Sequence, residues 1–348
     1  METPKKIRVL IVDDSALVRR ILTECLAGQP DLEVVGAAAD PYIARDMIVE
    51  LQPDVLTLDL EMPRMDGLTF LRKLMRFRPM PVIVISSLAQ ASCATALRAL
   101  EEGAVDTLGK PAGPYSVGDL RTMLADRIRA AAKARVRLPA AQGEAPASPV
   151  APPRVAALRS THVIAIGAST GGTEAIRQVL EQFPANIPGV VITQHIPAGF
   201  SKAFSERLNH LCRMEVKEAA DGDELYPGRV LVAPGGFHMM LRRAGSGYRV
   251  AVQEGPRVCY QRPSVDVLFR SVAEAAGPNA VGALLTGMGS DGATGLSQIR
   301  QSGAPTIAQD EDTCVVFGMP REAIRLGAAA QVLPLQQIAP AILRLVTV

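Results

Sequence analysis

The chain has 348 residues, of which 48% are hydrophobic and 21% are charged, and its formal net charge is +2. This length suggests two domains, each able to bury its own core. The small net charge gives no reason to expect a nucleic-acid partner. No apolar stretch approaches the roughly 20 residues that cross a bilayer, and the N-terminal apolar run lacks a cleavage site. We therefore expect a cytoplasmic protein with no direct membrane insertion.

The five cysteines are scattered along the chain and show no CxxC spacing. An odd number without paired spacing argues against a disulfide framework or a zinc site. We interpret them as buried or unreactive thiols, with a cysteine nucleophile as an open alternative.

Apolar runs alternate with helical patterns through both halves of the chain. Unbroken apolar strands between helices are typical of parallel sheets that are covered on both faces. We predict the α/β class, with two doubly wound parallel-sheet domains, the second a larger three-layer domain. The predicted strands are 7–14, 32–38, 55–62, 81–87 and 104–111 in the first half, and 162–169, 189–195, 229–236 and 280–287 in the second.

The composition changes after Lys133, where alanine and proline dominate and the apolar period is lost. Such a stretch is typical of a semi-rigid linker. We predict a first domain at 1–126, a linker at 127–160 and a second domain at 161–348.

Polar residues stand at the ends of four predicted strands in the first half. Asp13 and Asp14 end the first strand and Asp59 ends the third, so their carboxylates are expected to converge on one crevice. Three carboxylates there suit Mg²⁺ and a phosphoryl group. Ser86 and Lys110, after the fourth and fifth strands, can hold the oxygens of a modified carboxylate. Taken alone, each of these motifs could equally be a structural feature: a turn, a helix cap or a surface lysine. The four motifs together, each at a strand end, do not fit that interpretation.

Over residues 5–125 this half resembles a response-regulator receiver domain, whose fold is flavodoxin-like. The resemblance implies that Asp59 is the phospho-acceptor and that Ser86 and Lys110 sense the phosphate. It also implies a set of Mg²⁺ ligands: the side chains of Asp13, Asp14 and Asp59 and the backbone carbonyl of Glu61. The sequence departs from the family at Thr107, where many receivers have an aromatic switch residue.

A glycine-rich turn, Gly167–Gly172, joins a predicted strand to a helical pattern in the second half. It has neither the lysine of a Walker loop nor the GxGxxG spacing of a dinucleotide site. It matches G-x-S-x-G, a turn that exposes a serine hydroxyl above a sheet, here Ser169. Backbone N–H groups at the start of the next helix could stabilise an oxyanion. A phosphate-binding turn is the alternative.

A serine nucleophile needs a base, and the chain has four histidines. His195 directly follows a predicted strand, at the same sheet edge as Ser169. His162 opens a strand and so lies at the wrong edge, while His210 falls in a helical pattern. His238 follows a strand by several residues and stays a rival.

Asp291 lies in a third strand–glycine loop–helix unit and could orient the imidazole. Its alternative role is a helix cap or turn former. Ser169, His195 and Asp291 each follow a different strand at one edge, as a Ser-His-Asp site requires. This arrangement favours an acyl-transfer hydrolase over a phosphate binder.

Six dispersed segments make the second half similar to the catalytic domain of the CheB-type chemotaxis methylesterases. They are "IGASTGGTEAI", "ITQHIPAGFSKAFSERLN", "APGGFHM", "QRPSVDVLF", "LLTGMGSDGATGL" and "CVVFGMPREAI". The resemblance implies hydrolysis of glutamate γ-methyl esters on methyl-accepting chemoreceptors to glutamate and methanol, with deamidation of receptor glutamines as a second activity. Thr170 and Met288 would line the site and provide oxyanion donors.

The resemblance further implies regulation by phosphorylation. A chemotaxis histidine kinase would phosphorylate Asp59, and the unphosphorylated receiver would inhibit the esterase. Mg²⁺ would serve the receiver, whereas the esterase chemistry would need no cofactor.

Two other classes of function stay open at this point. One is a receiver joined to a nucleotide- or phosphate-binding module, based on the glycine turns at Gly167 and Gly287. The other is a DNA-binding response regulator. We rank it last because the second half is far longer than a helix-turn-helix needs and has α/β alternation.

Overall fold

The structure is a computed structural model, and it describes residues 5–87, 89–110, 117–134, 136, 158 and 161–347. The chain forms two compact units, Met1–Gln142 and Gly143–Val348. Residues 137–157 of the predicted linker lie outside the described part, and the three predicted domain boundaries stay predictions.

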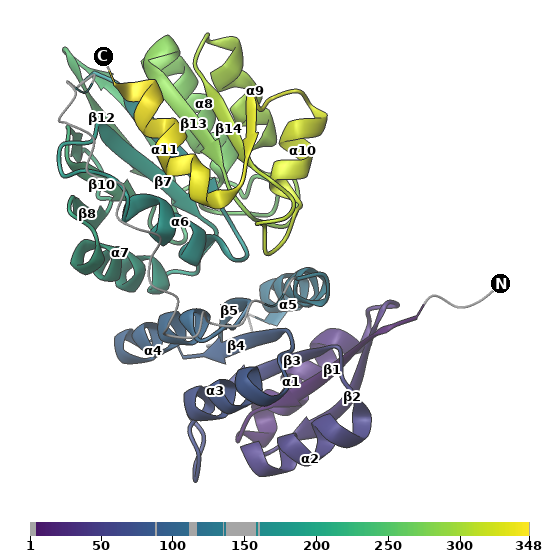
Figure 1. Cartoon of the computed structure of the whole chain (residues 1–348). Helices are drawn as coiled ribbons and strands as arrows, with labels where there is room; N and C mark the ends of the chain where they lie inside the picture. Colours follow the sequence, from purple (N-terminus) through teal and green to yellow (C-terminus); the bar gives the residue numbers. More distant parts are fainter. Residues whose placement is uncertain are drawn as a thin grey trace. The chain divides into compact units, whose positions relative to one another are not determined.

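The N-terminal unit is built on a five-stranded parallel sheet in the order β2-β1-β3-β4-β5 (Figure 1). All five strands that the sequence predicts for this half are present. Their central residues are almost wholly buried, as expected for a sheet that is covered on both faces. The strands are β1 (Ile7–Val12), β2 (Leu32–Ala38), β3 (Val55–Asp59), β4 (Val82–Ser86) and β5 (Asp106–Gly109).

Helices follow each strand of this sheet, and α1 packs against α5 while α3 packs against α4. Ser15, Asp40 and Asp66 cap the first three helices by accepting hydrogen bonds from backbone N–H groups of the first turn. The last helix continues past residue 126, and its Arg127 forms a buried ion pair with Asp106. The helices are α1 (Ala16–Ala27), α2 (Pro41–Leu51), α3 (Gly67–Phe77), α4 (Gln90–Glu101) and α5 (Val117–Ala132).

The C-terminal unit is built on a seven-stranded parallel sheet in the order β15-β14-β13-β6-β7-β10-β8. The four strands that the sequence predicts here are present, and three short ones (β8, β14 and β15) are additional. The strands are β6 (Val163–Ala168), β7 (Gly189–Gln194), β8 (Glu215–Glu218), β10 (Arg229–Val232), β13 (Ala280–Leu284), β14 (Thr306–Gln309) and β15 (Gln331–Leu333).

Helices cover both faces of the seven-stranded sheet. In Figure 1, α6 and α11 lie together on one face, and α8 and α9 lie together on the other. This three-layer arrangement confirms the predicted fold class. The helices are α6 (Gly172–Leu180), α7 (Phe200–Leu211), α8 (Val265–Ala276), α9 (Ala293–Gln301), α10 (Met319–Arg325) and α11 (Leu335–Val346), with a 3₁₀ turn, η2, at Gly277–Asn279.

The sequence analysis missed a small antiparallel sheet, in which β11 and β12 lie between β10 and α8 in the chain and β9 precedes β10. It consists of β9 (Glu224–Leu225), β11 (His238–Ala244) and β12 (Gly247–Gln253). The backbone N–H of Leu241 donates to Ser271 Oγ at 2.8 Å and so fixes this small sheet to α8.

In each parallel sheet there is a pair of neighbouring strands from which the chain continues in opposite directions: β1 and β3 in the first unit, and β13 and β6 in the second. Loops that leave the carboxyl ends of such a pair of strands diverge, which opens a crevice for ligands. The strand-end residues singled out above therefore lie where an α/β sheet usually carries its site.

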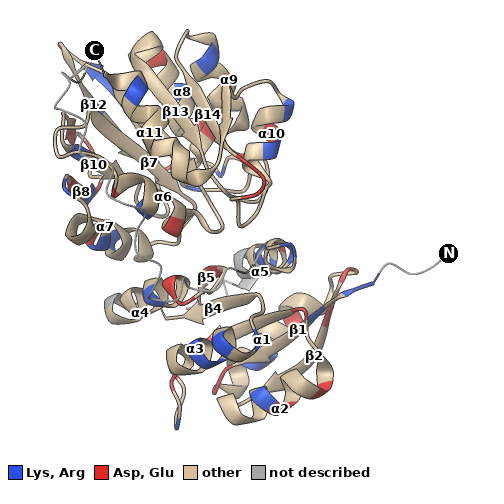
Figure 2. Cartoon of the chain, viewed as in Figure 1, with Lys and Arg blue, Asp and Glu red and all other residues tan. Residues whose placement is uncertain are grey.

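Basic and acidic residues are interspersed along the helices of both units (Figure 2). Within the described residues, no helix is both long and apolar enough to cross a membrane. All five cysteines are free, and Cys259 is the exposed one.

Candidate functional site

Ser169 stands at the tip of a tight turn between β6 and α6. Its N–H donates to the Thr286 carbonyl at 2.9 Å, and its own carbonyl accepts from the Gly172 N–H at 2.7 Å. Gly171 has φ = 76°, and a Cβ added there would lie 2.6 Å from Val315 Cβ. Only glycine fits this position, so the backbone around the serine is fixed.

His195 follows β7 directly and is buried. Its backbone N–H donates to the Ala168 carbonyl at 3.1 Å, which holds it beside the Ser169 turn. Its Nε2 lies 2.7 Å from Asp291 Oδ2. The strands that carry the three residues, β6, β7 and β13, are neighbours in the sheet, so the structure brings the predicted triad members to one place.

Asp291, in the loop between β13 and α9, is 2% exposed and accepts four hydrogen bonds. Oδ2 accepts from His195 and from the Val265 N–H at 2.7 Å, and Oδ1 accepts from Ser264 Oγ at 2.8 Å and the Asp266 N–H at 3.0 Å. Burial acts to raise the pKa of Asp291, but the hydrogen bond and charge of His195 and the remaining donors outweigh it and lower the pKa. The carboxylate therefore stays ionised and fixes His195.

The other histidines do not join this cluster. His238 Nε2 lies 2.9 Å from the Pro256 carbonyl, and its Nδ1 accepts from the Ser264 N–H at 3.2 Å. His210 is exposed near the end of α7, and His162 precedes β6 at the opposite edge of the sheet. His195 is the histidine that the geometry favours as the base.

Sequence reasoning missed three residues that hold this cluster in place. Gln194 is buried and donates from Nε2 to the Ser169 carbonyl at 2.8 Å. Ser264 binds Asp291, and Thr286 accepts the Ser169 N–H. The available signals were the place of Gln194 beside His195 and the helix-capping pattern of "PSVD".

Thr170 follows Ser169 in the chain, and the segment that contains Met288 approaches Ser169 at Gly287. Thr170 is buried, and its carbonyl accepts from Thr286 Oγ1 at 3.0 Å. Met288 follows Gly287, where an added Cβ would lie 2.7 Å from Ser169 Cβ. Both segments thus border the serine, and a role for their N–H groups as oxyanion donors stays a prediction.

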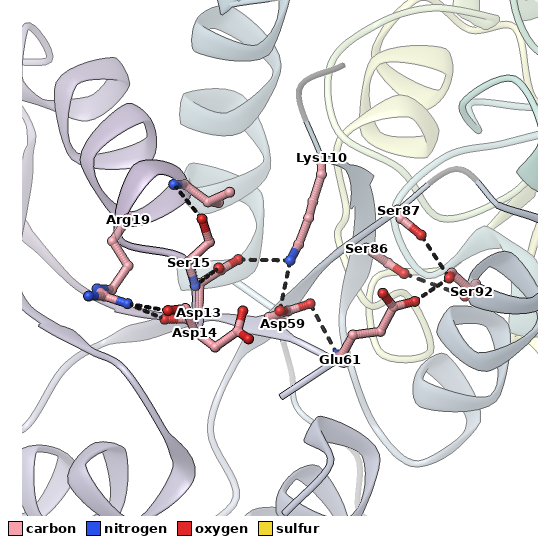
Figure 3. A network of polar contacts seen from close by, with 11 residues as sticks. Asp13, Asp14, Ser15, Arg19, Asp59, Glu61, Ser86, Ser87, Ser92 and Lys110 are labelled. Carbon is pink, nitrogen blue, oxygen red and sulfur yellow. Dashed lines mark hydrogen bonds and ion pairs between the residues drawn. The ribbon is translucent and has the colours of Figure 1, made fainter. Parts of the chain in front are cut away.

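In the N-terminal unit, the predicted phosphorylation residues converge at the ends of β1, β3 and β5 (Figure 3). Lys110 Nζ lies 2.7 Å from Asp59 Oδ2 and 3.2 Å from Asp13 Oδ2. One carboxylate oxygen from each of Asp13, Asp14 and Asp59 lies within 4.8 Å of the others. Hard oxygen donors in this arrangement fit Mg²⁺, with Asp14 exposed toward solvent.

The electrostatics of this second site differ from those of Asp291. Burial raises the pKa of Asp59, although Lys110 opposes the shift, and the negative charge of Asp13 adds to it. Burial raises the pKa of Asp13 in the same way. The site therefore gathers the three carboxylates of Asp13, Asp14 and Asp59 near the ammonium of Lys110, so a further positive charge would offset the excess negative charge.

The remaining receiver residues lie around the same strand ends. Ser86 is buried and its Oγ lies 3.5 Å from the Ser92 carbonyl, on the side of α4. The Glu61 N–H donates to Asp59 Oδ1 at 3.2 Å, and the Glu61 side chain accepts from Ser92 Oγ (Figure 3). Thr107 is buried within β5, so this position presents a small polar side chain and no aromatic ring.

Together the two units define a protein that combines a receiver-type carboxylate cluster with a Ser-His-Asp cluster on a second α/β sheet. Family models agree with this division. Residues 9–123 match the response regulator receiver domain, and residues 164–342 match the CheB methylesterase family.

Similar proteins extend over nearly the whole chain. A protein-glutamate methylesterase/protein-glutamine glutaminase of Chromohalobacter salexigens is 56% identical over 98% of this chain and 97% of its own length. A relative with the same enzyme name and the number 2, from Syntrophus aciditrophicus, is 54% identical over 98% of this chain and 99% of its own length. The solved Thermotoga maritima CheB methylesterase catalytic domain is 37% identical with a TM-score of 0.53, covering 54% of this chain and 100% of that domain. The chain belongs to the CheB methylesterase family.

Proposed function

We propose that this chain hydrolyses γ-methyl esters of glutamate side chains on chemoreceptors, releases methanol, and also deamidates receptor glutamines. The observation that carries the proposal is the cluster of Ser169, His195 and Asp291 at the ends of three adjacent strands, with Nε2 of His195 2.7 Å from Asp291. The names of the relatives support the substrate class. Family membership disfavours both a nucleotide-binding module and a DNA-binding output.

In this mechanism Ser169 Oγ attacks the ester carbonyl. Because Asp291 accepts a hydrogen bond from Nε2 of His195, Nδ1 is the basic nitrogen that takes the serine proton. The resulting imidazolium is stabilised by the ionised Asp291. His195 then gives its proton to the methoxy oxygen as the C–O bond breaks and methanol leaves, or to the amide nitrogen of a glutamine as the C–N bond breaks and ammonia leaves. A water molecule then gives its proton to His195 and attacks the acyl-enzyme, which releases glutamate and restores the Ser169 hydroxyl.

The tetrahedral intermediate carries a negative oxygen that needs fixed donors. The N–H groups of Thr170 and Met288 are our candidates, because both segments border Ser169. Gln194 supports the same geometry by holding the Ser169 carbonyl. No cofactor is required for these steps.

We assign regulation to Asp59 as the acceptor of a phosphoryl group from a chemotaxis histidine kinase. Asp13, Asp14, Asp59 and the Glu61 carbonyl would hold Mg²⁺, which supplies positive charge to the phosphoryl oxygens. Lys110 and Ser86 would then bind those oxygens. The unphosphorylated N-terminal unit would inhibit the esterase, and the protein would work in the cytoplasm beside receptor tails.

The decisive experiment measures methanol release from methylated receptor membranes. Ser169→Ala is expected to lower the rate by about 10⁴-fold or more, because it removes the nucleophile. Ser297→Ala, which alters a serine on α9 away from the cluster, is the matched control. Substantial turnover by Ser169→Ala would contradict the proposal.

A second experiment addresses regulation. Asp59→Asn should abolish stimulation of methanol release by a small phosphodonor, whereas Asp46→Asn, an exposed acid on α2, should respond like the wild type. If Asp59→Asn still responds to the donor, then Asp59 is not the acceptor.

A further inference from the structure

Residues 255–264 connect β12 to α8 and lie beside the acid of the triad; we call them the rim segment. At one end, Ser264 caps α8 and donates to Asp291. In the middle, Cys259 Sγ lies within 4.8 Å of a carboxylate oxygen of Asp291. The rim segment therefore borders the site on the side of Asp291.

The rim segment is fastened at both ends by buried or half-buried side chains. His238 is 5% exposed, and its two ring nitrogens contact the Pro256 carbonyl and the Ser264 N–H. Since Nδ1 accepts a hydrogen bond, Nε2 carries the proton and donates to Pro256. Arg262 Nη1 donates to the Gly255 carbonyl at 2.8 Å. These contacts hold both ends of the rim segment in place.

The middle of the rim segment is a two-residue turn with an unusual backbone. Val258 and Gln261 pair through both of their backbone hydrogen bonds, at 3.0 and 2.8 Å. The two residues between them, Cys259 and Tyr260, have φ of 49° and 63°. Turns of this kind usually carry glycine, asparagine or aspartate, because other side chains are strained at positive φ.

The strained turn projects an aromatic ring. Tyr260 is 79% exposed, whereas Pro263 and Ser264 behind it are buried. A single exposed apolar side chain is ordinary on a protein surface. Here, however, the ring stands on a fixed turn next to the triad acid, and strained backbone of this kind clusters at functional sites.

We propose that Tyr260 is a specificity-determining contact whose ring packs against the helix that presents the methylated glutamate to Ser169. This inference rests on the proposed function and adds how the protein substrate is recognised. An aromatic ring with two rotatable bonds supplies contact area at little entropic cost, and a preformed turn lowers that cost further. A free small ester has no helix to make this contact.

The test compares two substrates, methylated receptor membranes and N-acetylglutamate γ-methyl ester, with the full-length protein. Asparagine tolerates positive φ, so Tyr260→Asn should keep the turn. In this variant, kcat/KM for receptor membranes divided by kcat/KM for the small ester should fall about tenfold. Tyr260→Phe keeps the ring and should keep the wild-type ratio. Tyr226→Asn is the matched control, because Tyr226 is also exposed but precedes β10 at the opposite sheet edge.

An unchanged ratio in Tyr260→Asn, or an equal fall in Tyr260→Phe, would overturn the inference. Measuring how tightly the Ser169→Ala protein binds the methylated receptor tests the Tyr260 contact independently of the proposed enzymatic function. If the wild type releases no methanol but Tyr260→Asn still weakens this binding about tenfold, the enzymatic proposal fails and the contact stands. Binding that is equal with and without Tyr260→Asn would overturn the contact.

Discussion

Asp59 and Asp291 are both buried carboxylates near the carboxyl end of a parallel strand, yet their pKa values move in opposite directions. Burial acts to raise both. Asp291 accepts four hydrogen bonds, including one from His195, and its pKa falls below the ordinary value. Burial and the negative charge of Asp13 raise the pKa of Asp59, and Lys110 offsets only part of this increase.

The difference separates two uses of the same side chain. A carboxylate whose lone pairs are all engaged is held in one orientation and can orient a neighbour, as we propose for Asp291. A carboxylate that keeps acceptor capacity beside a second acid attracts a cation and can accept a phosphoryl group, as we propose for Asp59. The number of donors around the oxygens distinguishes them better than the extent of burial does.

The largest expected effect is on Asp291, the carboxylate that accepts four hydrogen bonds. Asp291→Asn should lower kcat for methanol release by about 10³–10⁴-fold, because an amide cannot orient and stabilise the imidazolium. The matched control is Asp223→Asn, since the pKa of Asp223 is also lowered but by Ala220 and Lys217 outside the site. A loss below about tenfold would show that Asp291 is a structural cap and nothing more.

The turns that follow Asp59 and Ser169 provide the next comparison. A Cβ at Gly67 would lie 2.0 Å from the Asp59 carbonyl, whereas Gly171 combines positive φ with a clash against Val315. Gly171→Ala should lower the free energy of unfolding by about 2–4 kcal/mol, from backbone strain and overpacking together. Gly222→Ala has the same sign of φ but open space around it, and should cost about 1 kcal/mol in urea denaturation.

Equal losses for the two alanine variants would contradict the steric part of this prediction. Adding Val315→Ala to Gly171→Ala should recover part of the loss, because it removes the side chain that the new Cβ meets.

The carboxylate cluster of Asp13, Asp14 and Asp59 should bind Mg²⁺. At about ten times its Kd, Mg²⁺ should stabilise the N-terminal unit by about 1.4 kcal/mol, measured as a shift of its thermal transition. Asp13→Asn removes a ligand and should abolish the shift, while Asp291→Asn should leave it intact. A shift that persists in Asp13→Asn would place the ion elsewhere.

The smallest effect concerns Asp31, a surface carboxylate whose pKa is shifted mainly by a hydrogen bond. The hydrogen bond from Arg129 lowers the pKa of Asp31 from 3.8 to about 2. Since the folded-state pKa is depressed, the stabilisation is present above pH 3.8 and is lost as the pH falls toward 2. Salt and solvent screen this exposed pair, so its contribution at neutral pH should be at most about 1 kcal/mol.

The measurement is urea denaturation of wild type and Asp31→Asn between pH 2 and 7. The difference between the two proteins should shrink as the pH falls from 4 to 2. A difference that is constant with pH would mean that the Arg129 pair does not stabilise the fold.

Much of this fold is predictable from local pattern. Long apolar strands such as Val163–Ala168 are buried on both faces, so their composition alone marks them. Ser169, His195 and Asp291 could be selected because parallel strands end at one edge of the sheet. The fold class follows from the same alternation and was confirmed by the structure.

The rest depends on tertiary contacts that no local pattern encodes. The ribbon β11–β12 alternates only partly, since its strands mix buried and exposed residues against α8. Gln194 and Ser264 act through contacts 25 and 27 residues away in the chain. Their side-chain types fit many roles, and only the folded chain reveals their partners.

Asp291 serves two structures at once, because the same carboxylate binds His195 and terminates the backbone of α8 through Val265 and Asp266. Opening the first turn of that helix removes two backbone donors that hold the acid beside the imidazole. Activity should therefore disappear in the same cooperative step that exposes the α8 amides to hydrogen exchange, before the sheet unfolds. We therefore expect the geometry of the proposed triad to be only as stable as the first turn of α8.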